Sequence, residues 1–363
     1  MDWKTELRCR VTTVDELDVV MPMDAQTRAS VASVLEQRPF SINPYYLNLI
    51  DFSQEQDPIR KIAVPSFEEL DIAGDLDTSG EAGNTVVRGL QHKYAQTALM
   101  LSTSECAMYC RHCFRRRLVG RTEDEVVSDL EVVYNYLMAH REIVNVLVSG
   151  GDALMNSNER LDEILGMLIE IDHLNFIRIA TRMPVVLPSR VSGDSELLDM
   201  LAGYAARKQL IVVTQFDHPR EVTPDAADAV KALRQAGIPV LNQTVLLRGV
   251  NDDVETLSRL LRNLTTVGAI PYYVFQCRPV SGVKQRFQVP FERGIEVVEG
   301  AKALQAGPAK ALRYCLSHVT GKIEIVGKLE DGKMLFKYHE AKDATDLGRL
   351  FSLEMTEGQA WLD

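Results

Sequence analysis

The sequence predicts an α/β fold, a TIM-like partial (β/α)6 barrel with an N-terminal helical region and a small C-terminal β extension. From about residue 97, short apolar runs rich in Val and Ile alternate with amphipathic stretches of helical length. The runs are continuously apolar, which is typical of parallel strands covered by helices on both faces. Six such units suit a partial barrel better than a closed eight-fold one, and an open doubly wound sheet is the alternative.

The N-terminal segment, up to about residue 92, predicts irregular helices. Thr13 is expected to cap a helix, because Glu16 follows three residues later in the arrangement of a capping box. Pro44 to Asp51 predicts a short apolar helix. Gly74 to Asn84 is rich in Gly and Asp, so we expect a loop there that leads into the main domain.

The main domain is expected to contain six strands, each followed by a helix. The predicted strands are Thr97–Thr103, Val144–Ser149, Phe176–Ala180, Leu210–Gln215, Val240–Leu247 and Tyr272–Gln276. The predicted helices lie near 124–140, 158–171, 194–207, 223–236, 253–266 and 290–305. Thr223 and Asn251 are expected to cap two of these helices. Ligands of such folds bind at the carboxyl ends of the strands, so functional side chains are expected there.

The C-terminal part changes pattern after about residue 308. Lys322–Gly327 and Lys333–Tyr338 alternate like the strands of a hairpin, and Glu330–Gly332 supplies the turn. We therefore expect three regions. They are an N-terminal helical region at 1–92, a barrel at 93–307 and a C-terminal extension at 308–363.

The composition limits the partners and the location that we expect. The chain has 363 residues and a net charge of −11, so nothing points to a nucleic acid or a membrane surface as partner. The first ten residues are charged and lack the apolar core of a secretory signal peptide. No apolar run reaches the roughly 18 residues that a membrane span needs. A cytoplasmic location is expected.

Three of the six cysteines, Cys106, Cys110 and Cys113, lie within eight residues, directly after the first barrel strand. A disulfide framework explains such a triplet poorly in a chain long enough to build its own core. The C-x3-C-x2-C spacing lets one loop hold three corners of a four-iron cluster. The fourth iron can then chelate an amino acid's amine and carboxylate. The alternative is a structural zinc site that recruits His112.

Several motifs together resemble the radical SAM superfamily, and within it the lysine 2,3-aminomutase family. The motifs are Asn43–Leu47, His92–Tyr94, Cys106–Arg117, Ser149–Asp152, Arg182–Pro188, His218–Pro219 and Asn242–Gly249. The resemblance runs from Trp3 to about Lys322 and implies an isomerase of the intramolecular aminotransferase type. Such an enzyme uses a [4Fe–4S] cluster to cleave S-adenosylmethionine (SAM) reductively to a 5′-deoxyadenosyl radical. The superfamily further implies flavodoxin or ferredoxin as the low-potential electron donor.

The resemblance also implies which residues bind SAM. Ser149, Gly150, Gly151 and Asp152 match the turn that binds its methionyl amino group. Glycines allow a close approach of the backbone, and a carboxylate can accept from an ammonium. Arg182 and His218, which follow the third and fourth predicted strands, are expected near SAM as well.

The family carries pyridoxal phosphate (PLP) on a lysine in a Gly-rich stretch, and the matching residue here is Lys322. Its interval from Gln276 is the same as in the family, although the glycine run has shrunk to Gly321. The contacts to the phosphate map to Lys93, Gln243 and Thr97. Lys93 and Thr97 stand where the lysine enzyme has arginines, so the predicted pocket lacks the two-pronged contact that arginine gives.

The predicted substrate site departs most from the lysine enzymes. Arg115 matches the arginine that holds the substrate carboxylate. Arg278 and Cys315 stand where lysine-specific members have two aspartates around the distal ammonium. Arginine repels an ammonium and suits a carboxylate, so we expect an acidic or neutral amino acid as substrate, not lysine. The family's zinc-binding cysteines have no counterparts, with Asp253 at one position, so any homo-oligomer is expected to form without that metal.

Two alternatives remain open at this point. The first is a PLP-independent radical SAM enzyme of the same lineage that abstracts hydrogen from a different small molecule. The second is a non-catalytic iron–sulfur or zinc scaffold, which would not turn over SAM. The sequence also leaves open whether the substrate is a free amino acid or a residue within a protein.

Overall fold

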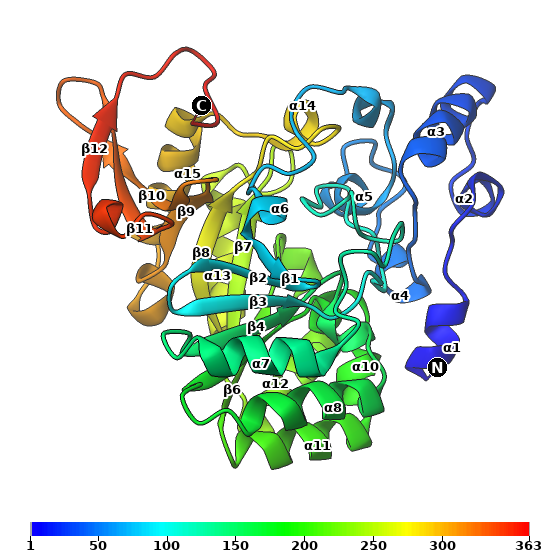
Figure 1. The fold of residues 1–363 in the computed structure, drawn as a ribbon. Coiled ribbons are helices and arrows are strands. Elements are labelled where there is room, and N and C mark those ends of the chain that lie inside the picture. Colours follow the sequence, from blue (N-terminus) through cyan, green and yellow to red (C-terminus); the bar gives the residue numbers. More distant parts are fainter. Residues whose placement is uncertain (1, 363) are drawn as a thin grey trace.

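The computed structural model describes residues 2–362, and all its strands belong to one sheet whose strands follow the order of the chain (Figure 1). The strands are β1 Thr85–Val87, β2 Leu90–Tyr94, β3 Thr97–Leu101, β4 Asn145–Ser149, β5 Phe176–Ala180, β6 Gln209–Thr214, β7 Val240–Leu246, β8 Ala269–Gln276, β9 Arg313–Ser317, β10 Gly321–Lys328, β11 Met334–Ala341 and β12 Leu350–Leu353. β3 to β9 pair in parallel, and the strands before and after them pair antiparallel. An unbroken sequential order has no point where the strand order reverses, so the barrel prediction is confirmed and the doubly wound alternative is wrong.

Helices cover the outside of this sheet and build the N-terminal region (Figure 1). The α-helices are α1 Trp3–Arg8, α2 Val14–Val20, α3 Ala25–Gln37, α4 Pro44–Leu47, α5 Pro58–Ala63, α6 Glu81–Asn84, α7 Leu130–Ala139, α8 Asn158–Ile169, α9 Met183–Val186, α10 Ser189–Ser192, α11 Ser195–Ala205, α12 Pro224–Gln235, α13 Val254–Val267, α14 Lys284–Phe287 and α15 Phe291–Ala303. The 3-10 helices are η1 Phe67–Leu70, η2 Ala153–Met155, η3 Pro219–Glu221, η4 Gly307–Lys310 and η5 Ala344–Asp346. No helix among the described residues is long and apolar enough to cross a membrane.

The six predicted strands are all present as β3 to β8, and the predicted hairpin is β10 and β11. Thr13 and Thr223 cap α2 and α12 as expected. Asn251 does not cap α13, because Asp253 accepts the capping hydrogen bond and the amide of Asn251 donates to carbonyls of neighbouring loops. The helix predicted from residue 124 begins later, at Leu130, since Asp129 accepts from two backbone N–H groups and fixes the start there.

Four short strands, β1, β2, β9 and β12, were not predicted, and the last of them pairs antiparallel with β11. β1 and β2 lie directly after the expected loop and pair antiparallel in front of β3. β9 adds a seventh parallel strand beside β8 and precedes the predicted hairpin. The sheet therefore continues from the N-terminal region through the barrel into the C-terminal strands.

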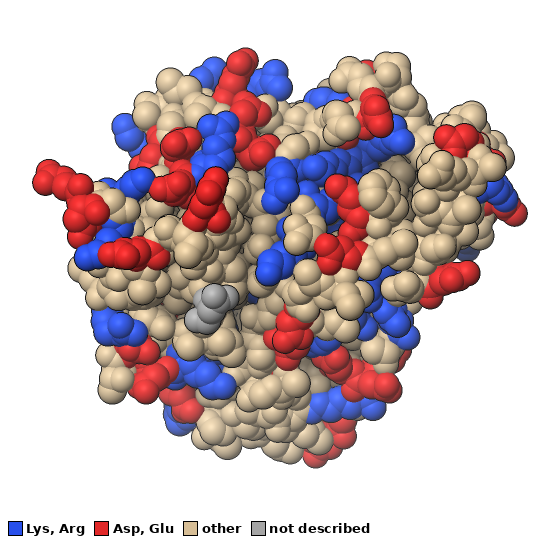
Figure 2. All heavy atoms as spheres, turned by 90° about the horizontal axis from the view of Figure 1, so that it is seen from above, with Lys and Arg blue, Asp and Glu red and all other residues tan. Residues whose placement is uncertain are grey.

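The inside of the barrel is lined by every second residue of its strands. Along β7, Val240, Asn242, Thr244 and Leu246 are buried, whereas Gln243 and its alternate neighbours are half-buried. A period of two places the half-buried set on the opposite face, toward the barrel interior. Seen from above, Lys and Arg side chains gather in a band across the upper middle of the molecule, although its net charge is −11 (Figure 2).

Candidate active site

The three clustered cysteines lie on the loop that follows β3, and this loop is anchored to the N-terminal region. The backbone N–H of Tyr109 donates to Ser41 at 2.9 Å, and that of Arg111 donates to Ile62 at 2.8 Å. The side chain of Arg10 reaches the carbonyl of Cys106 at 3.4 Å. The helical N-terminal region therefore shapes the cysteine loop from outside the barrel.

Glu69 is the central anion behind this loop, and the sequence analysis missed it. Its buried carboxylate accepts from Arg111 at 2.9 and 2.6 Å and from Arg286 at 3.0 Å, and it also pairs with Arg116. Burial alone would raise the pKa of Glu69, but these guanidinium groups outweigh burial and lower it to about 2. The Ser66–Glu69 capping pattern was visible in the sequence, yet it predicts a helix start and nothing about the arginines.

The cysteine thiols suit a cationic cluster. Burial raises the pKa of all three, that of Cys110 to about 11, so their thiolates need a positive partner. Arg182 provides one such charge, since its Nη1 donates to the Sγ of Cys110 at 2.8 Å.

A single zinc ion fits the cysteines less well than a cluster. Two sulfurs on one tetrahedral zinc lie ~3.8 Å apart, given Zn–S bonds of ~2.3 Å. Among the residues that the structure describes, the cysteines do not form a trio whose ligand atoms all lie within 4.8 Å of one another. His112, the fourth ligand of the zinc alternative, has its Nε2 beside Gln215 at 2.9 Å and Asp217 at 3.4 Å.

The glycine turn after β4 packs directly on the cysteine loop. Gly151 donates its N–H to Thr103 at 2.7 Å, and Asp152 donates its N–H to Glu105 at 2.8 Å. A Cβ on Gly150 would meet the Thr103 carbonyl at 2.2 Å, and one on Gly151 would meet the Glu105 carbonyl at 2.3 Å. Both positions therefore need glycine because the turn and the cysteine loop approach each other so closely. The close approach to SAM that the sequence predicts would be a second reason.

Asp152 and Arg182 link the next two strand ends. The carboxylate of Asp152 accepts from the N–H of Leu154 at 3.0 Å, the hydroxyl of Thr181 at 2.6 Å and the N–H of Arg182 at 2.6 Å. One Oδ2 lone pair remains for a ligand, because the oxygen Oδ1 already accepts two of these bonds. Arg182 in turn donates to Glu221 at 2.5 Å.

His218 lies in the same network, at the loop after β6. Glu221 accepts from the N–H of His218 at 2.9 Å and from the hydroxyl of Tyr46 at 2.5 Å, which explains the Asn43–Leu47 motif as a tie to this loop. Burial, followed by the charges of Arg220 and Arg259, lowers the pKa of His218 to about 4. The imidazole is therefore neutral at physiological pH.

Arg115 is held by a carboxylate that the sequence analysis did not single out. Its Nε donates to Glu81 at 2.9 Å, and its Nη1 donates to the Ser149 hydroxyl at 2.9 Å. Arg117 pairs with the other oxygen of Glu81 at 2.8 Å. Burial would raise the pKa of Glu81, but Arg115, Arg117 and Arg278 together lower it. Glu81 is an ionised carboxylate at the position where a substrate carboxylate is expected.

The side chain of Arg278 also contacts segment 74–84, instead of extending into the solvent. Its Nη1 donates to the Ser79 hydroxyl at 2.6 Å, and its guanidinium lies 3.9 Å from the centre of the Phe114 ring. The segment that carries Ser79 and Glu81 is fixed to the loop after β8, where Asp75 donates to Pro279 at 3.1 Å. Gly74 has φ +108°, and a Cβ there would meet the Pro279 carbonyl at 2.1 Å.

Lys322 is the second residue of β10, and its side chain has one acidic and one aromatic partner. Its Nζ lies 3.1 Å from Glu340 and 4.8 Å from the centre of the Tyr273 ring. Gln243 pairs with Tyr273 across β7 and β8, so both side chains lie on the same face of the sheet. Thr97, which the sequence also predicts as a phosphate contact, has a hydroxyl that accepts a hydrogen bond from the side chain of Asn145 at 3.0 Å.

Lys93 joins this cationic group from β2. Its Nζ donates to the carbonyl of His318 at 2.5 Å and to that of Ser79 at 3.4 Å. Burial, then the nearby charges of Arg278 and Lys342, lower the pKa of Lys93 to about 8. The structure thus brings Lys93, Arg115 and Arg278 around segment 74–84, and among the described residues Arg115 forms an ion pair with Glu81, whereas Lys93 and Arg278 form none.

Comparisons with known proteins identify the family of this chain. The model of the radical SAM superfamily matches residues 100–261. An Aquifex aeolicus protein provisionally assigned as an L-lysine 2,3-aminomutase is 41% identical over 96% of this chain and 93% of its own length. The L-lysine 2,3-aminomutase of Clostridium subterminale is 39% identical over 87% of this chain and 74% of that enzyme.

A relative of different specificity also matches. The glutamate 2,3-aminomutase of Clostridioides difficile is 35% identical over 85% of this chain and 73% of that enzyme. The family brings with it a [4Fe–4S] cluster, SAM and a small-molecule substrate. The chain therefore belongs to the lysine 2,3-aminomutase family of the radical SAM superfamily, and is an isomerase of that family.

Proposed function

We propose that this chain is a SAM- and PLP-dependent amino acid 2,3-aminomutase whose substrate is an acidic amino acid. The observation that carries the proposal is the group of cations at the barrel mouth, where Lys93, Arg115 and Arg278 share Glu81 and Ser79 as partners. A site with surplus positive charge recruits anions. PLP brings a phosphate, and an acidic amino acid brings two carboxylates.

Lys322 would hold PLP, and its surroundings fit that role. Its side chain is mostly buried, and Glu340 lies 3.1 Å from Nζ, where it can accept the proton that the ammonium loses before it acts as a nucleophile. Lys93 and Gln243 would contact the phosphate. When bound, PLP gives the migrating amino group a π-bond through which it can pass from one carbon to the next.

The remaining residues would position SAM and the substrate. Cys106, Cys110 and Cys113 would hold the cluster, while Ser149–Asp152, Arg182 and His218 would hold SAM beside it. Arg115 would take the α-carboxylate of the substrate in place of Glu81. The net reaction exchanges the amino group on Cα with a hydrogen on Cβ, so no oxidant or reductant is consumed overall.

Arg278 would determine the substrate specificity. Relatives named for lysine and for glutamate both match this chain, so identity alone does not decide between them. The guanidinium of Arg278 packs on the Phe114 ring and donates to Ser79, so a substrate ammonium there would meet a like charge that has no ion-pair partner among the described residues. A side-chain carboxylate of the substrate would instead form an ion pair with the guanidinium of Arg278.

The test for PLP uses anaerobically purified protein with its cluster reconstituted and PLP added. After reduction with borohydride and digestion, we expect a pyridoxyl mass on Lys322. Lys322→Arg should abolish it, whereas Lys328→Arg, an exposed lysine of the same strand, should not. No adduct on Lys322, with SAM still cleaved, would favour the PLP-independent alternative.

The test for the substrate compares glutamate, aspartate, lysine and neutral amino acids by the β-amino product formed. We expect an acidic substrate to give the highest kcat/KM. Arg278→Met should lower that value by about two orders of magnitude, since losing one member of an enclosed charge pair costs ~2–5 kcal/mol. A wild-type preference for lysine would contradict the proposed specificity.

A further inference from the structure

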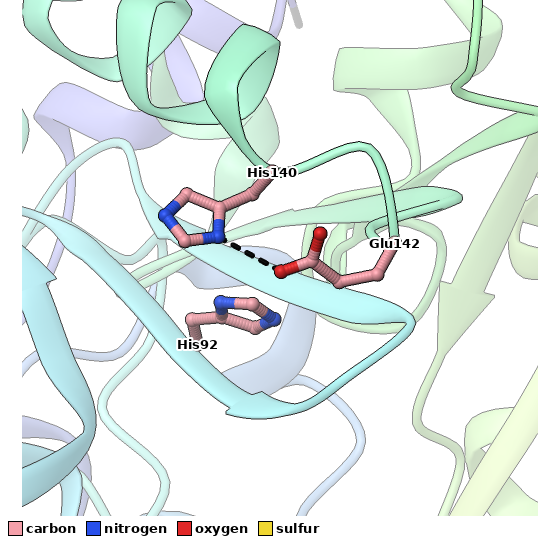
Figure 3. Close-up of side chains that lie close together, drawn as sticks. All are labelled: His92, His140 and Glu142. Carbon is pink, nitrogen blue, oxygen red and sulfur yellow. Dashed lines mark hydrogen bonds and ion pairs between the residues drawn. The ribbon is translucent and has the colours of Figure 1, made fainter.

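A second cluster of ligating side chains lies on β2 and at the end of α7, apart from the residues assigned above. It consists of His92 on β2, His140 directly after α7, and Glu142 in the connection to β4 (Figure 3). One ligand atom from each lies within 4.8 Å of the other two. We propose that these three side chains bind a divalent transition-metal ion of the zinc class, which ties β2 to the end of α7.

The donor set matches that class of ion. Two imidazole nitrogens and one carboxylate oxygen are ligands that zinc takes in three-residue sites, where a fourth position is filled by water. His140 and Glu142 already share a proton, with Nδ1 and Oε1 2.8 Å apart. A metal ion can replace that proton and bind both atoms, because ligand atoms of one tetrahedral zinc are ~3.3 Å apart.

One ring nitrogen of His92 points its proton at a carbonyl, and the other is held by a hydroxyl that a metal ion would have to displace. The Nε2 of His92 lies 3.1 Å from the carbonyl of Ala95, and a carbonyl can only accept, so Nε2 carries the proton. Nδ1 is then unprotonated and lies 2.9 Å from the hydroxyl of Tyr136. Metal-binding histidines commonly donate their other nitrogen to a carbonyl in this way. The Tyr136 ring also stacks on His140 at 4.1 Å and fixes its plane.

The local charge also favours a cation. Glu142 contributes an exposed carboxylate whose Oε1 already lies 2.8 Å from Nδ1 of His140. Among the described residues, no Lys or Arg forms an ion pair with Glu142. His140 is the C-cap residue of α7, where the negative end of the helix dipole attracts positive charge.

An ion here would join two segments that already touch. The carbonyl of Gln96, in the turn after β2, accepts from the N–H groups of Val144 at 3.0 Å and Asn145 at 3.2 Å. His92 directly precedes Lys93, the residue that reaches into the cationic group of the active site. The ion would thus hold the strand that presents Lys93, and its role would be structural.

The experiment uses the reconstituted holoenzyme, because cysteines that ligate the cluster cannot then capture added metal. Zinc chloride is titrated by calorimetry, and zinc per chain is counted after desalting. We expect one zinc per wild-type chain and a higher melting temperature with zinc. His140→Gln and Glu142→Gln should each weaken binding at least tenfold, whereas Glu131→Gln, an exposed carboxylate on the same helix, should leave it unchanged.

The zinc-free variants serve as the folding control. Without zinc, His140→Gln and Glu142→Gln should each have the cluster content and melting temperature of zinc-free wild-type enzyme, because neither His140 nor Glu142 is buried. Magnesium should not compete, because it prefers oxygen ligands in an octahedron. Zinc binding that is equal in His140→Gln and wild type, or wild-type enzyme that retains none after desalting, would overturn the proposal.

Discussion

The active site has two halves that are held together differently. The cluster half comprises the cysteine loop, the Ser149–Asp152 turn and the loops that carry Arg182 and His218. There, backbone groups interlock, and Asp152 has three of its four acceptor positions filled by the protein. In the substrate half, Arg115, Arg278 and Lys322 are held by Glu81, Ser79 and Glu340, side chains that an incoming ligand can replace.

This contrast teaches how one fold can keep its radical chemistry and still change its substrate. A half built from backbone contacts and buried ion pairs resists substitution, because most changes leave a steric clash or an unpaired buried charge. A half built from exchangeable side-chain contacts can be altered by single substitutions, such as a change of Arg278. Four substitutions test the contrast: the first changes activity, and the other three change stability, from the largest expected effect to the smallest.

The strongest test is Gly151→Ala, which places a Cβ 2.3 Å from the Glu105 carbonyl and pushes the turn off the cysteine loop. A displacement of ~1 Å at a reacting group costs ~10²-fold in rate, so SAM cleavage should fall about a hundredfold. The measurement is 5′-deoxyadenosine release with dithionite. Gly203→Ala, in an exposed helical position with open space, should be neutral or slightly stabilising. Equal activity in both variants would contradict the interlocked turn.

Arg182→Met is expected to have the largest effect on stability. It leaves the buried carboxylates of Asp217 and Glu221 without their cation, and breaking a buried pair costs ~3–5 kcal/mol. Arg207→Met removes an exposed pair with Glu170 and should cost under ~1 kcal/mol. Urea unfolding of anaerobic protein compares the two. Similar losses of unfolding free energy in the two variants would mean that the ion pairs of the cluster half stabilise the protein no more than an exposed ion pair does.

The third test is the pH dependence of stability. His218 has a pKa of about 4 in the folded protein and 6.5 as the reference value. As pH falls from 6.5 to 4, the unfolded chain therefore binds a proton that the folded protein does not, and stability decreases. The loss is at most about 3 kcal/mol, from ~1.4 kcal/mol per pKa unit. His218→Gln should flatten the profile, and an unchanged slope would rule out this contribution.

Glu81→Gln tests the exchangeable half and should have the smallest effect. Arg115 keeps Ser149 and Arg117 keeps Glu125 as partners, so the unfolding free energy should drop by only about 2 kcal/mol. Because no carboxylate then competes at Arg115, an acidic amino acid should raise the melting temperature more in the variant than in wild type. An equal or smaller rise would show that Glu81 is not displaced by ligand.

The sequence could indicate which residues lie together in the proposed cluster half, because they form short contiguous motifs. Cys106 to Cys113 and Ser149 to Asp152 are short motifs in which spacing itself carries the chemistry, and both lie at predicted strand ends. Glu69, Glu81 and Glu221 were missed because each meets its arginine across 34 or more positions of sequence. No local pattern marks such a partner.

The fold was predictable to a similar extent and for a similar reason. Apolar runs predicted β3 to β8, since burial on both faces leaves a clear pattern. β1 and β2 follow a Gly- and Asp-rich segment whose composition indicates a loop, and β9 is a short strand between less regular elements. These strands form because a neighbouring strand is available to pair with, which is information about the tertiary structure.

The sequential strand order also has a consequence for biosynthesis. A ribosome delivers the cysteine loop, the glycine turn and the strands that flank them long before it delivers β10, which carries Lys322. Because each parallel strand pairs with the one made just before it, the cluster-binding part can fold first, while the proposed cofactor lysine is still being translated. Assembly of the iron–sulfur cluster and attachment of PLP to Lys322 would then be separated in time on one nascent chain. The order of translation alone would set their sequence.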